Sequence, residues 1–421
     1  MADALVTFSR GRRNLLFVLA LSATILNLVD RQIISVLKPE MAHELGWSDN
    51  DYGTLAAWFQ GAAAVAFLFT GWIVDRLGVK WANPVGVALW SLAAMAHAIA
   101  RTFGQFVLCR VALGATEAMG TPAAIKTIAA IFPPAQRSNG YGLLNAIGSL
   151  GAIVTPLLIP FVALAWGWHG AFLLGGVLGL VWSVLWLVAV RGVRFGGDHD
   201  APGDVPATKR GPSILTERRS WAIAIAKFLS DATWWLMLFW MPDFFHRSFG
   251  LSGVALGPPL AIAYSCAAVG AVLAGTITTR MIAAGHDLAR VRKGALLVAA
   301  LFATPLPFAD LAHDYWLAVA LLGLVMAAHQ AFSSSLFTLI ADVSPPEKVG
   351  RVTSFGAFAG NIGGMVIAKV AGLVLAAKLG YLPLFLFAGF SYLLAYGAIQ
   401  LLMPRLPLEG VGSKGPPQGA H

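Results

Sequence analysis

Apolar runs long enough to cross a membrane recur along almost the whole chain, and they constrain its fold more than any other feature. A helix of about 20 apolar residues spans the hydrocarbon core of a bilayer. Of the 421 residues, 58% are hydrophobic and 12% are charged, whereas soluble domains average about 45–50% apolar and 25% charged residues. The sequence therefore predicts an all-α membrane protein in contact with a lipid bilayer.

The apolar runs predict twelve transmembrane helices in two groups of six. A polar segment at 191–220, rich in glycine, proline and aspartate, separates the groups and is typical of a flexible linker. We therefore expect a six-helix bundle at 1–190, a cytoplasmic linker at 191–220, and a second bundle with a short tail at 221–421. The expected helices lie at about 14–36, 52–74, 80–100, 104–131, 138–163, 170–190, 221–245, 255–283, 292–309, 315–341, 350–377 and 382–403.

Basic residues are distributed unevenly between the two sides of the predicted spans. If the N-terminus lies inside, 20 of the 29 lysines and arginines fall in cytoplasmic segments, four in outer loops and five within spans. An excess of basic residues marks the cytoplasmic side, so we expect both termini in the cytoplasm. The outer four are Lys38, Arg101, Arg247 and Lys378.

The two halves contain a weak internal repeat. The segment 71–80 reads GWIVDRLGVK, and the corresponding segment 275–285 reads GTITTRMIAAG, which keeps Gly275 and Arg280 but loses the aspartate. Such a repeat is expected when one six-helix unit has been duplicated. We therefore expect the two bundles to be pseudo-symmetric.

The spacing G-x-x-x-D-R-x-G-x-K at 71–80 resembles the major facilitator superfamily, as does the six-plus-six arrangement. The resemblance implies transport by alternating access. Asp75 could pair with a neighbouring helix end and Arg76 with a carboxylate, which would clamp the cytoplasmic side shut in one state. Alternatively, these charges sit in a solvated turn. The expected gating residues are Gly71, Asp75, Arg76, Gly78, Lys80 and Arg280.

Longer stretches resemble the anion:cation symporter branch of that superfamily. They read LVDRQIISVLKPE, CRVALGATEAMGTPAAIKTIAAIFPPAQRS, KFLSDATWWLMLFWMPDFF, AAHQAFSSSLFTLIADVSPP and AFAGNIGGMVIAKVAG. The last three, with the lysine of GTPAAIK, are most similar to hexuronate transporters for galacturonate and glucuronate. The chain departs from the branch pattern because Phe132 lacks a preceding tryptophan and Gln136 replaces a glutamate.

Charged residues inside the apolar runs are the main candidates for function. A charge at membrane depth costs at least about 2.5–3.5 kcal/mol, so it normally faces a protein interior or a wet cavity. Arg110 and Glu117 are seven residues apart, which puts both on one helix face about 10 Å apart along the axis. The small residues Gly114, Ala115 and Gly120 around them allow another helix to approach closely.

The resemblance assigns roles to four of these charged residues. It implies that Arg31 and Arg110 bind the substrate carboxylate, which suits the planar fork of arginine. It also implies that Asp30 and Glu117 carry protons as the coupling ion. The structural alternatives are a salt bridge between Glu117 and Arg110, and ion pairs of Asp30 and Arg31 with other helices.

Further candidate substrate contacts lie in polar or aromatic stretches of the other spans. Lys126 could instead extend toward the membrane surface, and Lys227 with Asp231, spaced i,i+4, could be a structural or gating pair. One of Trp234 and Trp235 is expected to face the cavity, whereas Trp240 is expected to anchor at the membrane interface. The candidates are Lys126, Asp231, Trp234, Trp235, His329, Gln330, Ser334 and Asn361, with Asn27 and Asn145 as weaker ones.

Other function classes lack support in the sequence. The net charge of +9 is spread over short loops, which argues against nucleic-acid binding. No GxxxxGK[ST], HExxH or CxxC motif occurs, so we expect neither an ATP-driven pump, a metal site nor an enzyme, and no cofactor besides protons.

The expected function is a monomeric, proton-coupled symporter that imports a hexuronate across a bacterial-type inner membrane. The nearest alternative is a carrier of another organic anion, such as the aldonate galactonate or a monocarboxylate. A drug–proton antiporter and a non-transporting sugar-acid sensor are more distant alternatives. Ile147 and Ala63 leave the particular sugar acid open, because related carriers have polar or aromatic residues there.

Overall fold

The computed structural model describes residues 9–133, 136–137, 140–141, 143–144, 147, 150–193, 195 and 213–406, and their regular secondary structure is entirely helical. Three short 3₁₀ turns lie at Ile214–Thr216, Gly253–Leu256 and Leu306–Ala309. The α-helices are α1 (Arg10–Val36), α2 (Lys38–Leu45), α3 (Asp49–His97), α4 (Phe103–Glu117), α5 (Gly120–Ile131), α7 (Leu150–Ala189), α8 (Arg218–Phe249), α9 (Gly257–Ala283), α10 (Leu288–Ala303), α11 (Tyr315–Val343), α12 (Pro346–Ala376) and α13 (Leu382–Leu402).

These helices account for the twelve predicted crossings. Within the described part of the chain, nine helices are long and apolar enough to cross a membrane. Two of them are pairs of crossings joined at a kink: Gly78 in α3 has φ 67° and ψ 168°, and Gly167 in α7 has φ 66° and ψ 176°. Positive φ favours glycine because it has no Cβ. Together α4 and α5 make one more crossing, so the all-α, twelve-helix prediction is confirmed.

The predicted continuous helix at 104–131 is wrong, because the structure breaks it between Glu117 and Gly120. Pro122 explains the break: its nitrogen cannot donate to the Ala118 carbonyl, and its ring crowds that oxygen. The predicted helix at 292–309 likewise ends as an α-helix at Ala303 and continues as a 3₁₀ turn. The start of the predicted helix at 138–163 falls partly outside the described residues.

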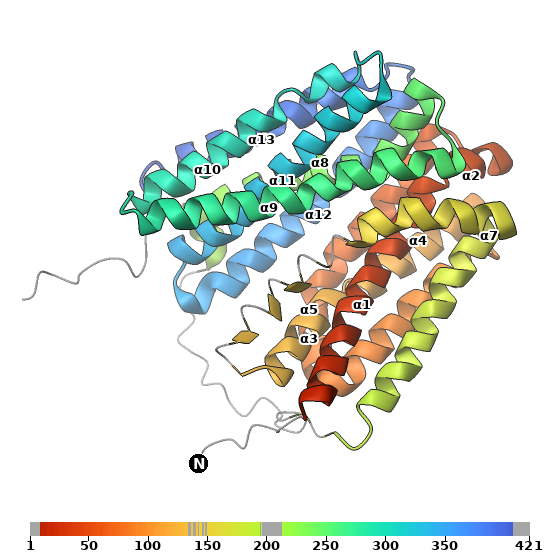
Figure 1. Ribbon diagram of the computed structural model, residues 1–421, viewed down its shortest axis with the longest axis horizontal. Helices are drawn as coiled ribbons and strands as arrows, with labels where there is room; N and C mark the ends of the chain where they lie inside the picture. Colours follow the sequence, from red (N-terminus) through yellow and green to blue (C-terminus); the bar gives the residue numbers. More distant parts are fainter. Residues whose placement is uncertain are drawn as a thin grey trace, which may run out of the picture.

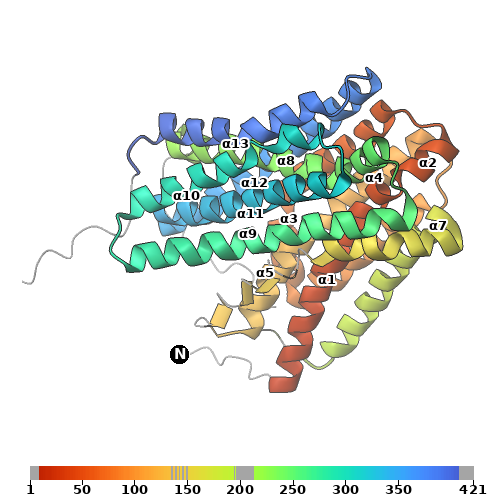
Figure 2. The same ribbon diagram turned by 45° about the horizontal axis from the view of Figure 1, so that its top comes forward.

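The helices form two bundles, α1–α7 and α8–α13 (Figures 1 and 2). In both views the bundles meet where α2 lies, which we call the α2 end, and their helices diverge toward the opposite, far end. Helix α3 packs against α12, α1 against α8, and α7 against α9. The predicted close approach around Gly114 is confirmed, since a Cβ there would lie 2.3 Å from the Phe59 carbonyl oxygen.

Candidate functional site

An ion pair links α1 to α4 inside the first bundle. Arg31 Nε donates a hydrogen bond of 2.5 Å to Glu117 Oε2. Glu117 is buried, and its Oε1 has no hydrogen-bond partner among the described residues. A salt bridge between Glu117 and Arg110, the structural alternative raised by their spacing, is therefore wrong for this structure. Arg31 reaches Glu117 because α1 packs against α5, which begins three residues after Glu117.

Arg110 lies two turns before Glu117 on α4 and is 1% exposed. Its Nε and Nη2 atoms have no hydrogen-bond partner within the described part of the chain. Its guanidinium carbon lies 5.9 Å from the centre of the Phe59 ring, and that of Arg31 lies 5.6 Å from the same ring. Both guanidinium groups therefore lie near the same aromatic ring. A buried guanidinium with unused donors is costly unless an anion or another acceptor binds it.

Asp30 points away from Arg31, as expected for adjacent helical residues. It is 1% exposed, and neither carboxylate oxygen has a partner among the residues that the structure describes. Its Oδ1 faces α7, where a Cβ added at Gly175 would lie only 2.5 Å away. The structure thus buries Asp30 between α1 and α7, so the alternative of an ion pair between Asp30 and another helix is not found among the described residues.

The second bundle brings Trp235 to Arg31. The Arg31 guanidinium carbon lies 5.7 Å from the centre of the Trp235 ring. On α12, a Cβ added at Gly364 would lie 2.4 Å from Trp235 Cδ1 and 2.8 Å from Gln60 Nε2. The site therefore lies at the seam between the bundles. Phe59 and Gln60 were not predicted from the sequence, although a glutamine inside an apolar run needs a polar partner and was a usable signal.

Several other residues predicted to contact substrate have partners within the second bundle. Trp234 stacks on His329 with ring centres 4.9 Å apart, and His329 Nδ1 lies 2.9 Å from the Tyr392 hydroxyl. Asn361 and Ser334 donate to carbonyls of their own helices. Gln330 is half-buried on α11.

The Lys227–Asp231 pair forms as its i,i+4 spacing predicted. Lys227 Nζ lies 2.8 Å from Asp231 Oδ2. On α12, a Cβ added at Gly360 would lie 2.1 Å from that same oxygen, so Asp231 is packed against α12. The ion-paired carboxylate of Asp231 therefore lies at the interface between α8 and α12.

The predicted gating motif lies at the far end, where it contacts Lys126. Lys126 Nζ lies 3.0 Å from Asp75 Oδ1 and donates to the Val74 and Asp75 carbonyls at 3.3 Å. Arg76 is exposed and lies 4.1 Å from the centre of the Trp72 ring instead of on a carboxylate. The structure thus brings Lys126 to the motif and not to Arg31 and Arg110. Of the remaining motif residues, Gly78 forms the kink, Lys80 is half-buried, and Gly71 and Arg280 are exposed.

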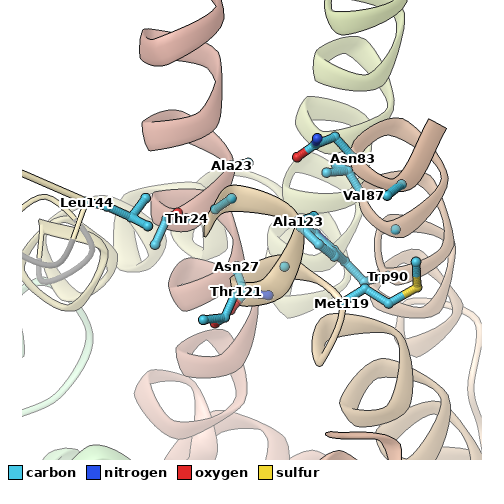
Figure 3. A pocket seen from close by; sticks show the side chains of 14 residues that line it. Ala23, Thr24, Asn27, Asn83, Val87, Trp90, Met119, Thr121, Ala123 and Leu144 are labelled. Carbon is cyan, nitrogen blue, oxygen red and sulfur yellow. The ribbon is translucent and has the colours of Figure 1, made fainter. Parts of the chain in front are cut away.

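A cavity of about 120 Å³ adjoins the break between α4 and α5 (Figure 3). Asn27 and Trp90 line it, and Asn27 Nδ2 donates to the Glu117 carbonyl at 3.4 Å. The Trp90 Nε1 atom has no partner among the described residues. The weaker candidate Asn27 therefore lies beside Glu117, whereas Asn145 falls outside the described residues.

Four charged side chains join the bundles at the α2 end, and we call them the ionic quartet. Lys38 Nζ lies 2.8 Å from Asp49 Oδ1 and 2.7 Å from Asp243 Oδ1. Arg247 Nε lies 2.7 Å from Asp243 Oδ2, and its Nη2 also pairs with Asp49. The quartet was not predicted from the sequence, because its two halves, Lys38 with Asp49 and Asp243 with Arg247, lie about 200 positions apart in the chain.

Trp240 lies beneath the quartet, 1% exposed, with Lys38 Nζ 4.5 Å from the centre of its ring. The predicted interface role for Trp240 is therefore wrong. Its place on α8 faces the other bundle, so the indole is buried at the seam instead of reaching lipid headgroups.

Outside the spans, Glu217 joins the start of α8 to α12. Its carboxylate accepts hydrogen bonds from Arg219 Nε and Lys348 Nζ, both at 2.5 Å. The bond from Arg219, followed by that from Lys348, holds the pKa of Glu217 below its usual value. Both cations favour the ionised carboxylate.

Known proteins share this sequence pattern and fold. The family described as Major Facilitator Superfamily matches residues 20–368. The hexuronate transporter of Escherichia coli strain K12 is 27% identical over 393 residues, covering 89% of this chain and 90% of that protein. The D-galactonate transporter of Escherichia coli O6:H1 is 23% identical over 418 residues, covering 92% of this chain and 96% of that protein.

A solved structure has the same fold. It is a bacterial homologue of the human lysosomal transporter Spinster, in an inward-facing and unoccupied conformation. It superposes with a TM-score of 0.75 at 18% identity, covering 94% of this chain and 96% of that one.

Proposed function

The chain belongs to the Major Facilitator Superfamily, and from that premise we propose that it is a proton-coupled symporter that imports a hexuronate across the inner membrane of a bacterium. As a member, it is a multi-pass membrane transporter and not an enzyme. Galacturonate or glucuronate is the proposed substrate, because the resemblance to the hexuronate transporter extends over nearly the whole chain. The proposed coupling ion is the proton.

The observation that carries this proposal is the buried guanidinium of Arg110, whose Nε and Nη2 have no partner within the described part of the chain. A carboxylate of the substrate would accept from these donors and offset the cost of burying them. Its oxygens would also compete with Glu117 for Arg31, which lies against the same Phe59 ring.

Competition for Arg31 would couple substrate to proton. Once Glu117 is released from Arg31 in a buried site, it binds a proton more favourably. A protonated Glu117 in turn leaves Arg31 free for the substrate. Binding of each ligand then favours binding of the other, which is the reciprocal coupling that symport requires. Asp30, buried without a described partner, is the second proposed proton carrier.

The proposed transport cycle rocks two domains, 1–190 and 221–421, about this seam, with 191–220 as a linker. Basic residues favour the cytoplasm for the far end and the outside for the α2 end. On this orientation the ionic quartet closes the outer side, and the conformation is inward-facing. The other proposed substrate contacts are Trp235 at the seam and, on the second bundle, Asp231, Trp234, His329, Gln330, Ser334 and Asn361.

An aldonate is the second candidate substrate. The D-galactonate transporter matches almost the same length of the chain as the hexuronate transporter does. A carboxylate is common to both substrate classes, so the arginines do not distinguish them. The discrimination must come from the sugar-facing residues of the second bundle.

The direct test is proton influx into proteoliposomes that contain a pH-sensitive dye. We expect galacturonate or glucuronate to drive acidification, and gluconate and galactose to leave the dye unchanged. Acidification with gluconate alone would support proton-coupled transport but show that gluconate, and not a hexuronate, is a substrate. No response to any acid, from folded and correctly inserted protein, would refute symport.

The role of Glu117 is tested by neutralising it. Glu117→Gln should retain exchange of labelled substrate, because the arginines remain, but should lose proton-driven accumulation. Asp310→Asn, which neutralises a carboxylate outside the spans, is the control and should retain both activities. Loss of exchange and accumulation together in Glu117→Gln would indicate a structural salt bridge.

A further inference from the structure

The ionic quartet shares each of its cations between the two bundles. Lys38 and Asp49 belong to the first bundle, whereas Asp243 and Arg247 belong to α8 of the second. Lys38 is 2% exposed and contacts one carboxylate of each bundle. Arg247 does the same. Two contacts, Lys38–Asp243 and Arg247–Asp49, therefore close the α2 end.

The remaining two contacts make the quartet able to open. When the bundles part, Lys38 keeps Asp49 and Arg247 keeps Asp243, because each of these pairs lies within one bundle. Each bundle is thus left with a neutral pair and no isolated buried charge. Breaking a buried ion pair is costly because it leaves an unpaired buried charge. Opening the quartet leaves no such charge.

Ion pairs between the bundles are found at the α2 end and not at the far end of the described structure. Lys126–Asp75 lies within the first bundle, and Arg292–Asp342 and Lys348–Glu217 lie within the second. The quartet is therefore the charged closure that separation at the α2 end must break.

A pocket of about 480 Å³ lies over the quartet, lined by residues of both bundles. Three of the four basic residues that the sequence assigns to outer loops line it: Lys38, Arg247 and Lys378. With Asp49 and Asp243 they leave one net positive charge, and Lys378 is exposed. A cationic hollow of this kind raises the local concentration of anions and steers them inward.

We propose that this pocket captures the carboxylate of an anionic substrate from outside, and that the carboxylate opens the α2 end by replacing Asp49 as a partner of Arg247. The inference rests on the proposed function, which supplies the anionic substrate and the orientation. Lys378 holds the arriving carboxylate beside Arg247. Asp49 retains Lys38 as its partner after the exchange.

The replacement favours the outward-open state for a thermodynamic reason. A ligand shifts a conformational equilibrium only by its differential affinity for the two states. Arg247 offers its guanidinium fully to a second carboxylate only after Asp49 has left. The carboxylate therefore binds more tightly to the state in which the bundles have parted.

The first test compares Lys378→Gln with Arg101→Gln in right-side-out proteoliposomes. Arg101 is the matched control because it is the one outer basic residue that does not line the pocket. We expect Lys378→Gln to raise KM for galacturonate uptake several-fold at low salt, with kcat unchanged and a weaker dependence of kcat/KM on salt. Arg101→Gln should match the unmodified protein. Equal effects of the two substitutions would overturn the capture site.

The second test measures binding at the pocket without transport. A fluorophore on Ala376→Cys, which lines the pocket, is titrated in protein that carries alanine at Cys109 and Cys266. We expect saturable responses to galacturonate and acetate, none to galactose, and binding several-fold weaker with Lys378→Gln than with Arg101→Gln. Responses that do not depend on Lys378, or an equal response to galactose, would overturn the proposal.

The two tests separate this proposal from the proposed function. Uptake of galacturonate with no effect of Lys378 in either test would overturn the capture site and leave symport standing. Carboxylate binding that depends on Lys378, in protein that transports no acid, would support the capture site and overturn the proposed function.

Discussion

Replacing Tyr52 with phenylalanine should shift the protein toward the state in which the bundles are parted at the α2 end. The Tyr52 hydroxyl donates a hydrogen bond of 2.7 Å to the Phe239 carbonyl oxygen, and both residues are buried. Tyr52 lies on α3 and Phe239 on α8, so this bond exists only while the bundles are together. The substitution removes it without adding volume.

The expected magnitude follows from the kind of bond that is lost. A buried neutral hydrogen bond contributes about 0.5–1.5 kcal/mol net, and about 1 kcal/mol corresponds to a roughly five-fold change in the ratio of the two states. The Phe239 carbonyl also belongs to the α8 helix, where it accepts an intrahelical bond. Tyr52→Phe therefore leaves no unpaired acceptor, which favours the lower half of this range.

The assay is a distance distribution between spin labels on cysteines placed at Arg101 and Leu311. Both positions are exposed and lie on different bundles, and Cys109 and Cys266 are replaced by alanine. We expect the population with the longer distance to rise about two- to five-fold in Tyr52→Phe, as the lower half of the bond-energy range gives.

The matched control is Tyr392→Phe. Its hydroxyl donates to the Ser230 carbonyl at 3.3 Å, entirely within the second bundle. Removing it should lower the thermal stability of the protein and leave the distance distribution unchanged. An unchanged distribution in Tyr52→Phe, or equal shifts in both variants, would refute the reasoning that this bond holds the α2 end closed.

Three further predictions concern separate parts of the molecule. Arg110→Gln should raise KM for substrate uptake roughly ten-fold or more, since charge-assisted hydrogen bonds contribute about 1.5–3 kcal/mol, and unchanged KM would remove Arg110 from the site. Gly53→Ala should increase the parted population in the spin-label assay, because its Cβ would lie 2.7 Å from the Ala368 carbonyl oxygen, whereas Gly104→Ala, with open space, should not. The lowered pKa of Glu217 implies that its ion pairs stabilise the protein above the unfolded pKa and that this stability is lost as pH falls through the lower folded value. Glu217→Gln should therefore reduce the fall in Tm between about pH 5 and pH 3. An identical fall in the variant and the unmodified protein would contradict the role of these ion pairs.

Local features of the chain were predictable because they depend on neighbours in sequence. Hydropathy located the spans, and the turns between them fell where Gly78 and Gly167 adopt positive φ. The Lys227–Asp231 pair was predictable because i,i+4 spacing places both side chains on one helix face. The break after Glu117 was also within reach, since Pro122 was visible in the sequence and its effect on a helix is local.

The candidate site was only half predictable. Residue type and membrane depth singled out Arg31, Arg110 and Glu117 as groups that need partners. Their actual pairing depends on how α1 packs against the α4–α5 segment, because Arg31 and Glu117 are 86 positions apart. Phe59, which lies beneath both arginines, was missed because a phenylalanine in an apolar run carries no signal of its own.

By itself, the sequence determined that this protein is an all-α membrane protein of twelve crossings with charged residues in its interior. Those properties follow from apolar length and from the cost of burying charge, which are the same for any packing of the helices. Only the tertiary structure decided which charges meet, as in Lys38 and Asp243, which lie 205 positions apart and 2.7 Å from each other. An ion pair requires close contact, and contact between distant segments is set by the packing of the two bundles.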